Sequence, residues 1–187
     1  LSSIVLGESL LVIENNAFSS CSSLTSITLP NTLVSIDYKA FALSGLTSIN
    51  IPSNIKKIGT QAFSGCYDLK AITVDANNPS YCDIDGVLCN KTKQILYQYP
   101  NAKGSDYEIP NTITKIEEYA FSLCKDVESL TIPASVGSIE YRALEGCSNL
   151  KKITCLRTSP ISATFVIFCP RTSPSKTPQE VRVSRAW

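Results

Sequence analysis

The stretch "LTSINIPSNIKKIGTQAFSGC" (residues 46–66) belongs to a set of closely similar segments in a chain of 187 residues. "LTSITLPNTLVSIDYKAFALS" precedes it from Leu24, and "VESLTIPASVGSIEYRALEGC" follows from Val127. Aligned segments begin at Leu1, Leu24, Leu46, Leu69, Val127 and Leu150. The spacings are 23, 22, 23, 58 and 23 residues, and the long one is about 23 plus an insert of about 35. A fixed repeat of this length indicates one small structural unit copied along the chain.

Each position of the repeat has a physical role. Ile49 and Ile51 are two residues apart, so both point to the same side of a strand and into a core. Pro52 ends that strand because proline cannot donate a ladder hydrogen bond. Ile55 and Ile58 turn inward from the returning segment, where we expect a second short strand. One repeat forms only a thin slab, so neighbouring repeats must cover its apolar positions.

The end of each repeat closes the coil. "TQAFSGC" (residues 60–66) predicts a short helical turn that packs Ala62 and Phe63 against the stack, and Gly65 helps the chain leave that turn. The position of Phe63 is apolar in the other copies as well, which predicts one continuous internal column. Its members are Phe18, Phe41, Phe63, Phe121 and Leu144.

A period in the low twenties lies in the range of leucine-rich repeats. The sequence therefore predicts a leucine-rich-repeat solenoid with a short parallel β-sheet on one face and short strands or helical turns on the other. We expect the array to cover residues 1–155 and to be interrupted by a β-hairpin insert at about 75–106. In the insert, "GVLC" and "QILYQYP" are β-prone runs joined by the polar turn "NKTK". Residues 156–187 are expected to form a degenerate C-terminal cap, with "ATFVIFC" covering the stack, and a tail.

Two groups of side chains are candidates for binding a partner. Residues that alternate with the buried strand positions face outward, where a solenoid displays its sheet. These are Ser26, Thr28, Ser48, Asn50, Ser129 and Thr131. Because they are small and polar, they either suit weak or multivalent contact or are simply soluble, strand-compatible surface residues. Tyr97 and Tyr99 lie two apart in the insert and serve either as binding anchors or as cover for the flank of the solenoid.

The composition excludes several classes of function. The chain has no histidine, which removes His-based triads, His-ligated metals and the commonest general base. No nucleotide-binding loop or nucleophile motif occurs, so we expect no catalytic residue, no cofactor and no small-molecule substrate. "DIDG" (residues 83–86) places its glycine too early for a calcium loop and is interpreted as a turn. The net charge is only +1 and no nucleic-acid motif occurs, so no nucleic-acid partner is expected, although the basic end of the chain would favour polyanions weakly.

Four of the eight cysteines recur at one position of the repeat. This recurrence favours a ladder of buried thiols, because a buried cysteine behaves as a small apolar residue. The spacing of stacked strands also permits a disulfide between Cys124 and Cys147. The four are Cys21, Cys66, Cys124 and Cys147. No C-x-x-C pair occurs anywhere in the sequence, so we expect no zinc site.

The insert carries two candidate modification sites. Cys82 and Cys89 flank its turn region and form the better candidate for a disulfide. Asn90 begins the N-glycosylation sequon Asn-Lys-Thr in the predicted hairpin turn, where it would be exposed. Outside the insert, Cys155 and Cys169 are candidates for a link within the cap.

The repeat and the insert together resemble the BspA-like leucine-rich-repeat family. The matching stretches are "LTSITLPNTLVSIDYKAF", "LTSINIPSNIKKIGTQAFSGC", "NNPSYCDIDGVLCNKTKQILYQYP" and "YEIPNTITKIEEYAFSLC", and the likeness covers roughly residues 1–155. The resemblance implies a non-catalytic binding protein that is secreted or anchored at the cell surface. It also implies protein partners such as host matrix or cell-surface proteins, and it supplies no catalytic residue.

A second function class stays open, namely an intracellular leucine-rich-repeat scaffold that regulates a partner enzyme such as a phosphatase. Free thiols and an unused sequon would favour the scaffold, whereas disulfides or a glycan at Asn90 would favour the surface. No apolar run approaches the ~18 residues of a membrane span. The N-terminus has neither Met nor the layout of a signal peptide, so we expect a longer parent protein. The resemblance implies that this parent is secreted or membrane-anchored.

Overall fold

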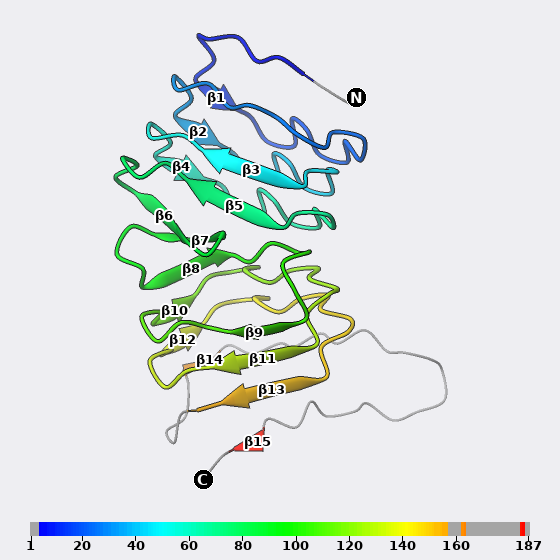
Figure 1. Cartoon of the computed structure of the whole chain (residues 1–187), viewed down its shortest axis with the longest axis vertical. Helices are drawn as coiled ribbons and strands as arrows, with labels where there is room; N and C mark the ends of the chain where they lie inside the picture. The colour runs from blue at the N-terminus through cyan, green and yellow to red at the C-terminus, as the bar shows by residue number, and fades with distance from the viewer. Residues whose placement is uncertain (1–3, 157–161, 164–183, 186–187) are drawn as a thin grey trace.

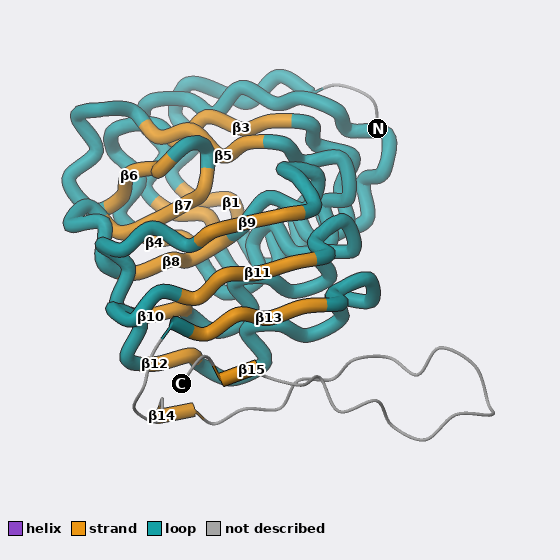
Figure 2. The backbone as a smooth tube through the Cα atoms, turned by 60° about the horizontal axis from the view of Figure 1, so that its bottom comes forward, coloured by secondary structure: helices purple, strands orange, loops and turns teal. Residues whose placement is uncertain are grey.

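A computed structural model of the protein describes residues 4–156, 162–163 and 184–185. The chain is a parallel β-solenoid whose coils stack along the long axis, with the first and last described coils at opposite ends (Figure 1). From the third coil on, each coil gives one strand to a front sheet and one to a back sheet, and long runs of turns connect them (Figure 2). The described residues of the first two coils give a strand to the back sheet alone. The solenoid predicted from the repeat is therefore confirmed.

The front sheet consists of two groups of parallel strands. One group pairs β3 (Ser48–Ile51) with β5 (Ala71–Val74). The other contains β9 (Asp106–Glu108), β11 (Ser129–Ile132), β13 (Lys152–Cys155) and β15 (Ser184–Arg185). Inward side chains lie in register from coil to coil, so that Ile49 is opposite Ile72. Within each group, this register stacks the apolar positions of the repeat into a wall of the core.

The back sheet is also in two groups. The first contains β1 (Val12–Ile13), β2 (Ser35–Ile36) and β4 (Lys57–Ile58). The second contains β8 (Ile95–Gln98), β10 (Lys115–Ile116), β12 (Ser138–Ile139) and β14 (Ser162–Ala163), with β7 (Val87–Asn90) and β6 (Tyr81–Ile84) added in antiparallel order. β8 is thus the junction between the insert and the regular coils.

The corners of the coils are runs of tight turns, and the described residues contain no helix. In the third coil, the Ala62 N–H donates to the Gly59 carbonyl at 3.1 Å, and the Cys66 N–H donates to the Phe63 carbonyl at 3.3 Å. Both turns place their third residue in the left-handed region, Gln61 at φ 61° and Gly65 at φ 70°. A positive φ in every turn prevents a helix from continuing, so the predicted helical turn is wrong.

The aromatic column predicted along the core exists as two shorter stacks. Phe18, Phe41 and Phe63 stack with ring centroids 5.2 and 5.7 Å apart. In the second stack, the ring of Tyr99 lies 5.0 Å from that of Phe121. Tyr99 takes the place of the missing phenylalanine, because its N–H donates to the Ala120 carbonyl as the Phe N–H groups of regular coils do to the next coil. The sequence pattern did not predict this role.

The insert is smaller than expected, because part of residues 75–106 belongs to regular coils. β8 is the back strand of the fourth coil, and β9 is the front strand of a complete fifth coil. The antiparallel pairing of β7 with β8 confirms the hairpin predicted from "GVLC" and "QILYQYP". β6 adds a second hairpin, closed by Asp85 at φ 50° and Gly86 at φ 75°, the geometry of a two-residue type I′ turn.

β7 divides the apolar core into two clusters. Leu88 packs with the N-terminal cluster, which includes Phe63, whereas Val87 and Cys89 pack with the C-terminal cluster, which includes Phe121. Alternate residues of one strand point to opposite faces, so β7 lies as a partition between the clusters. The expected cover by "ATFVIFC" and the link from Cys155 to Cys169 lie outside the residues whose side chains are described.

Candidate functional site

The candidate functional site is the outward surface of the front sheet, here called the front face. Its side chains lie in two rows, because strand register places equivalent residues beside one another. On the N-terminal strands, Ser48 lies opposite Ala71 and Asn50 opposite Thr73. On the C-terminal strands, the rows are Asp106, Ser129, Lys152 and Glu108, Thr131, Thr154. The residues of these rows are exposed or half-buried.

Hydrogen bonds within the rows order the front face. The Thr73 hydroxyl donates to Asn50 Oδ1 at 3.1 Å. Asp106 accepts from the hydroxyl of Ser129 and, at 2.9 Å, from that of Ser105. These hydrogen bonds lower the pKa of Asp106, with Ser129 as the larger cause. The front face therefore presents fixed polar groups on a shallow surface, which suits contact with another macromolecule better than enclosure of a small molecule.

The sequence predicted four front-face residues in β3 and β11 and missed five others. Ser48 and Asn50 are exposed, and Ser129 and Thr131 are half-buried. The missed residues are Thr73, Asp106, Glu108, Lys152 and Thr154. Their signal was present in "LKAITV", "SDYEIP" and "LKKITC", where the same alternation of outward and inward positions occurs.

Ser26 and Thr28 are exposed, but residues 24–30 form no strand. The segment is tied to the third coil by the Thr47 N–H, which donates to the Thr25 carbonyl at 3.1 Å. The two side chains therefore lie beyond the edge of the hydrogen-bonded sheet instead of on a strand, which differs from the prediction.

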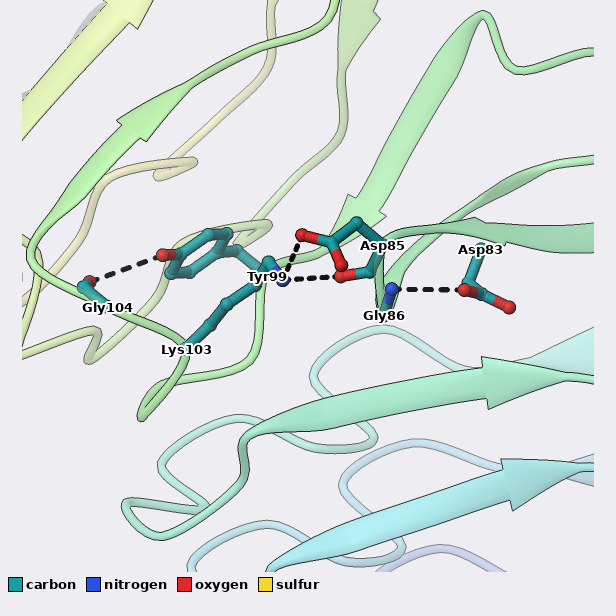
Figure 3. A network of polar contacts seen from close by, with 6 residues as sticks. All are labelled: Asp83, Asp85, Gly86, Tyr99, Lys103 and Gly104. Atoms are coloured by element: carbon teal, nitrogen blue, oxygen red, sulfur yellow. Dashed lines mark hydrogen bonds and ion pairs between the residues drawn. The ribbon is translucent and has the colours of Figure 1, made fainter.

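A cluster of polar contacts lies where the front sheet is interrupted between β5 and β9 (Figure 3). The Ile72 N–H of β5 donates to the Gly86 carbonyl at 2.8 Å, so the tip of the β6–β7 hairpin replaces a neighbouring strand. Figure 3 shows Lys103 reaching Asp85 at this tip, and its Nζ lies 2.8 Å from Asp85 Oδ2. The Lys103 side chain is mostly buried, and this contact lowers the pKa of Asp85.

The two tyrosines of the insert lie in different surroundings. Tyr99 is only 1% exposed, and its hydroxyl donates to the Gly104 carbonyl at 3.2 Å. Tyr99 therefore has no surface for a partner. It packs in the core, so of the two alternatives for this residue the structure favours packing over a binding anchor. Tyr97 is half-buried with its ring 5.6 Å from that of Tyr81, in an edge-on contact. Only Tyr97 retains exposed surface.

The cysteines at the repeat position behave as packing residues. Cys66 and Cys147 are buried, and their thiols donate to the carbonyls of Phe41 and Phe121 in the preceding coils, at 3.0 and 3.1 Å. Burial raises the pKa of Cys66 and of Cys124 above the usual value for a thiol. The seven cysteines within the described residues are all unbridged.

The two candidate modification sites of the insert are adjacent. Cys82 lies directly opposite Cys89 in the β6–β7 ladder, so the disulfide between them stays a prediction. Asn90 is half-buried, and its Oδ1 accepts hydrogen bonds at 2.8 Å from the N–H groups of Gln94 and Ile95. Its Nδ2 donates to the Thr92 hydroxyl at 2.7 Å. Asn90 thus organises the β7–β8 turn, and its glycosylation also stays a prediction.

Two kinds of site are absent from the described part of the chain. No three His, Cys, Asp or Glu side chains there are grouped so as to hold a metal ion. No helix there has the length and apolar character needed to cross a membrane.

A family model for the BspA-type leucine-rich repeat region, in six copies, matches residues 1–84 and 92–170. Among solved structures, the pneumococcal vaccine antigen PcpA is similar with a TM-score of 0.72 and 28% identity, over 78% of this chain and 37% of that one. A leucine-rich cell surface protein from Faecalibacterium prausnitzii A2-165 is similar with a TM-score of 0.66 and 32% identity, over 80% of this chain and 46% of that one. The chain therefore spans less than half of the length of either protein.

A leucine-rich-repeat protein from Eubacterium ventriosum ATCC 27560 is similar with a TM-score of 0.54 and 23% identity, over 70% of this chain and 48% of that one. At that identity the likeness shows the fold alone. A comparison with curated proteins found no match. These findings confirm that the solenoid is of the leucine-rich-repeat class.

Proposed function

Because the chain belongs to the BspA-type leucine-rich-repeat family, we propose that it is an adhesion module of a cell-surface or secreted protein. The membership confirms the resemblance read from the repeat and supports a binding module built from repeats. In our proposal the front face contacts an extracellular or host protein, and the parent protein carries the module at the cell surface.

The ordered front face is the observation that carries the proposal. Two rows of polar side chains run across coils in strict register, and Asp106 and Asn50 are already held by neighbours. Side chains that are fixed before binding lose less conformational entropy when a partner docks. A repeated surface of small polar groups also suits several weak contacts made at once.

Similar proteins support the surface location. One is a cell surface protein and another is a vaccine antigen by name. We extend this location to the present chain as part of the proposal.

The absence of catalysis is also part of the proposal. The chain has no histidine, and burial raises the pKa of Cys66 and Cys124, so that these thiols are poor nucleophiles. The described residues include no cluster that would activate a water molecule through a metal. A polar surface without an activated nucleophile supports binding as the function.

The experiment measures capture of intact cells or immobilised matrix proteins by the wild-type chain and by Ser48→Glu/Asn50→Lys. A second variant, Ser129→Lys/Thr131→Glu, tests the C-terminal strands of the front face. Each variant places one charge of each sign on the front face and leaves the net charge unchanged. We expect capture to fall at least about tenfold in one of the two variants, because unpaired charges placed at a contact are costly to desolvate.

Asn111→Lys/Thr112→Glu is the matched control, since it makes the same type of change in the exposed turn before β10. Circular dichroism and melting temperature check that all variants fold. Equal capture by the wild type, both front-face variants and the control would exclude the front face as the binding surface.

The intracellular scaffold remains the second candidate, because all seven described cysteines are unbridged. An intracellular protein keeps its thiols reduced, whereas disulfides persist in extracellular compartments. Non-reducing mass spectrometry of natively expressed protein separates the two functions. Fully reduced protein without a glycan at Asn90 supports the scaffold, and a disulfide or a glycan supports the surface module.

A further inference from the structure

A polar groove opens on the back of the solenoid where the third, fourth and fifth coils meet. Its volume is about 200 Å³. One wall is the first turn of the third coil, residues 59–62, and the other is formed by Glu117 and Glu118 of the fifth coil. Tyr97 and Gln98 of the fourth coil form its floor. The front face takes no part in this groove.

The groove exists because the fourth coil lacks two residues. In the third coil, Phe63 follows the strand residue Ile58 by five positions, and the fifth coil has the same spacing. In the fourth coil, Tyr99 follows Leu96 by only three positions, although Leu96 is in register with Ile116. The first of the two corner turns is therefore missing from the fourth coil, and the space it would fill is open.

In regular coils the first corner turn is hydrogen-bonded to the same turn of the preceding coil and of the following coil. The Lys39 N–H donates to the Thr60 carbonyl of the next coil at 3.3 Å, and the Tyr119 N–H donates to the Tyr141 carbonyl at 3.4 Å. In the third coil the N–H of Gln61 occupies the donor position, and in the fifth coil the carbonyl of Glu118 occupies the acceptor position. Both would pair with the turn that the fourth coil lacks. Neither the Gln61 N–H nor the Glu118 carbonyl has a partner among the described residues.

One peptide group would satisfy both of these atoms. In the missing turn, the carbonyl facing Gln61 and the N–H facing Glu118 belong to consecutive residues, and therefore to the same peptide unit. The corners of the third and fifth coils approach each other beside the groove, since a Cβ atom added at Gly65 would lie 3.1 Å from Leu123 Cδ1. We propose that this groove binds a tight turn of a partner protein, whose central peptide group accepts from the Gln61 N–H and donates to the Glu118 carbonyl.

Charge at the groove indicates which turn fits. Glu117 is paired with Lys115 at 2.7 Å, whereas Glu118 is exposed and forms no ion pair among the described side chains. At the equivalent left-handed position, regular coils of this chain include the basic residues Lys39 and Arg142. A partner turn with lysine or arginine at its third position therefore matches the backbone geometry and the carboxylate together. This site is independent of the front face, so either assignment can fail alone.

The test uses the acetyl-Gly-Lys-methylamide peptide as probe and two-dimensional ¹H–¹⁵N NMR of the whole chain as readout. We expect saturable shifts that centre on the amides of Gln61 and its neighbours, with slower hydrogen exchange at Gln61. An analogue with an ester oxygen in place of the lysine N–H loses the bond to the Glu118 carbonyl, so we expect it to bind about five- to tenfold more weakly. Equal binding of the ester, or no saturable shift at Gln61, would overturn the proposal.

Two variants connect the effect to the groove. Replacing residues 96–99 by "IEEYAF", the sequence of residues 116–121, restores the missing turn and should abolish binding of the probe. Because that variant alters the core, Glu118→Lys provides a milder test and should weaken binding about two- to fivefold by charge repulsion. Glu14→Lys makes the same change at an exposed position of the first coil and should leave binding unchanged. Binding that persists in the turn-restored chain, or tighter binding of N-acetylglucosamine at the same amides, would also overturn the proposal.

Discussion

The hydroxyl of Tyr81 accepts a hydrogen bond from the backbone N–H of Ile58 at 3.0 Å. Ile58 lies in β4, which pairs with β2 on one side and with no strand of the described residues on the other. An unpaired strand edge invites pairing with other chains. Tyr81, a residue of the insert, thus supplies a hydrogen-bond acceptor to the edge of β4, where the interrupted fourth coil provides no strand.

Tyr81→Phe should lower the free energy of unfolding by about 1–3 kcal/mol, because the half-buried Ile58 N–H would lose its acceptor. Urea denaturation followed by circular dichroism measures the change. Tyr67→Phe is the control, since that side chain is 41% exposed and should tolerate loss of its hydroxyl. Equal stability of the Tyr81 variant and the wild type would show that the hydroxyl does not protect the strand edge.

Tyr99→Ala should destabilise the chain by about 3–5 kcal/mol, as much as Phe63→Ala, because both truncate a large side chain that is almost fully buried. The comparison tests whether Tyr99 replaces the missing phenylalanine of the fourth coil. Denaturation of both variants under the same conditions gives the two values. A cost below ~1 kcal/mol for the tyrosine alone would contradict its role in the core.

The sequence predicted the regular coils well, because the alternation around Ile49 and Ile51 and the recurring aromatic position each have one physical solution. The sequence did not predict the role of Tyr99 in the fourth coil, because that coil is two residues shorter than the others before its aromatic position. Tyr99 occupies the aromatic position only if two residues are missing before it, and the pattern cannot be aligned across such a deletion without knowing the pairing of β8 with β10.

The same limit applies to the candidate sites. Ser48 and Asn50 could be assigned to the outward surface from alternation alone. The partners of Asp106 could not, because Ser129 is a neighbour only through parallel pairing across coils. The groove beside Gln61 could not be predicted either. The missing turn of the fourth coil is recognised only from backbone groups of the neighbouring coils that lack a hydrogen-bond partner.

Ser129→Ala should raise the pKa of Asp106 towards the usual ~3.9 for an aspartate, because the hydrogen bond from Ser129 is the main cause of its lowering. Titration of the carboxyl carbon by NMR measures the value. Ser105→Ala should produce a smaller rise, since its hydrogen bond is the second cause. The reverse order of the two effects would contradict the arrangement described for the front face.

Alkaline pH should destabilise the reduced chain. Burial raises the pKa of Cys89 from 9.0 to about 12, so the folded chain keeps a proton that the unfolded chain loses above pH 9.0. The stabilising effect is complete below the unfolded pKa and is lost as the pH rises towards the folded one. Cys89→Ala should therefore reduce the slope of unfolding free energy against pH by up to about 1.4 kcal/mol per unit. Urea denaturation at a series of pH values under reducing conditions measures both slopes, and identical slopes would contradict the prediction.

Cys82 and Cys89 should form a disulfide when the purified chain is equilibrated with oxidised glutathione. They lie directly opposite in an antiparallel ladder, where Cα atoms are about 4.5–5.5 Å apart and within reach of a disulfide. We expect non-reducing peptide mapping to show a Cys82–Cys89 cross-link, with a gain of about 2–3 kcal/mol in the free energy of unfolding from closure of a short loop. The buried Cys66 serves as internal control and should remain a thiol. Complete alkylation of Cys82 without prior reduction would contradict the pairing.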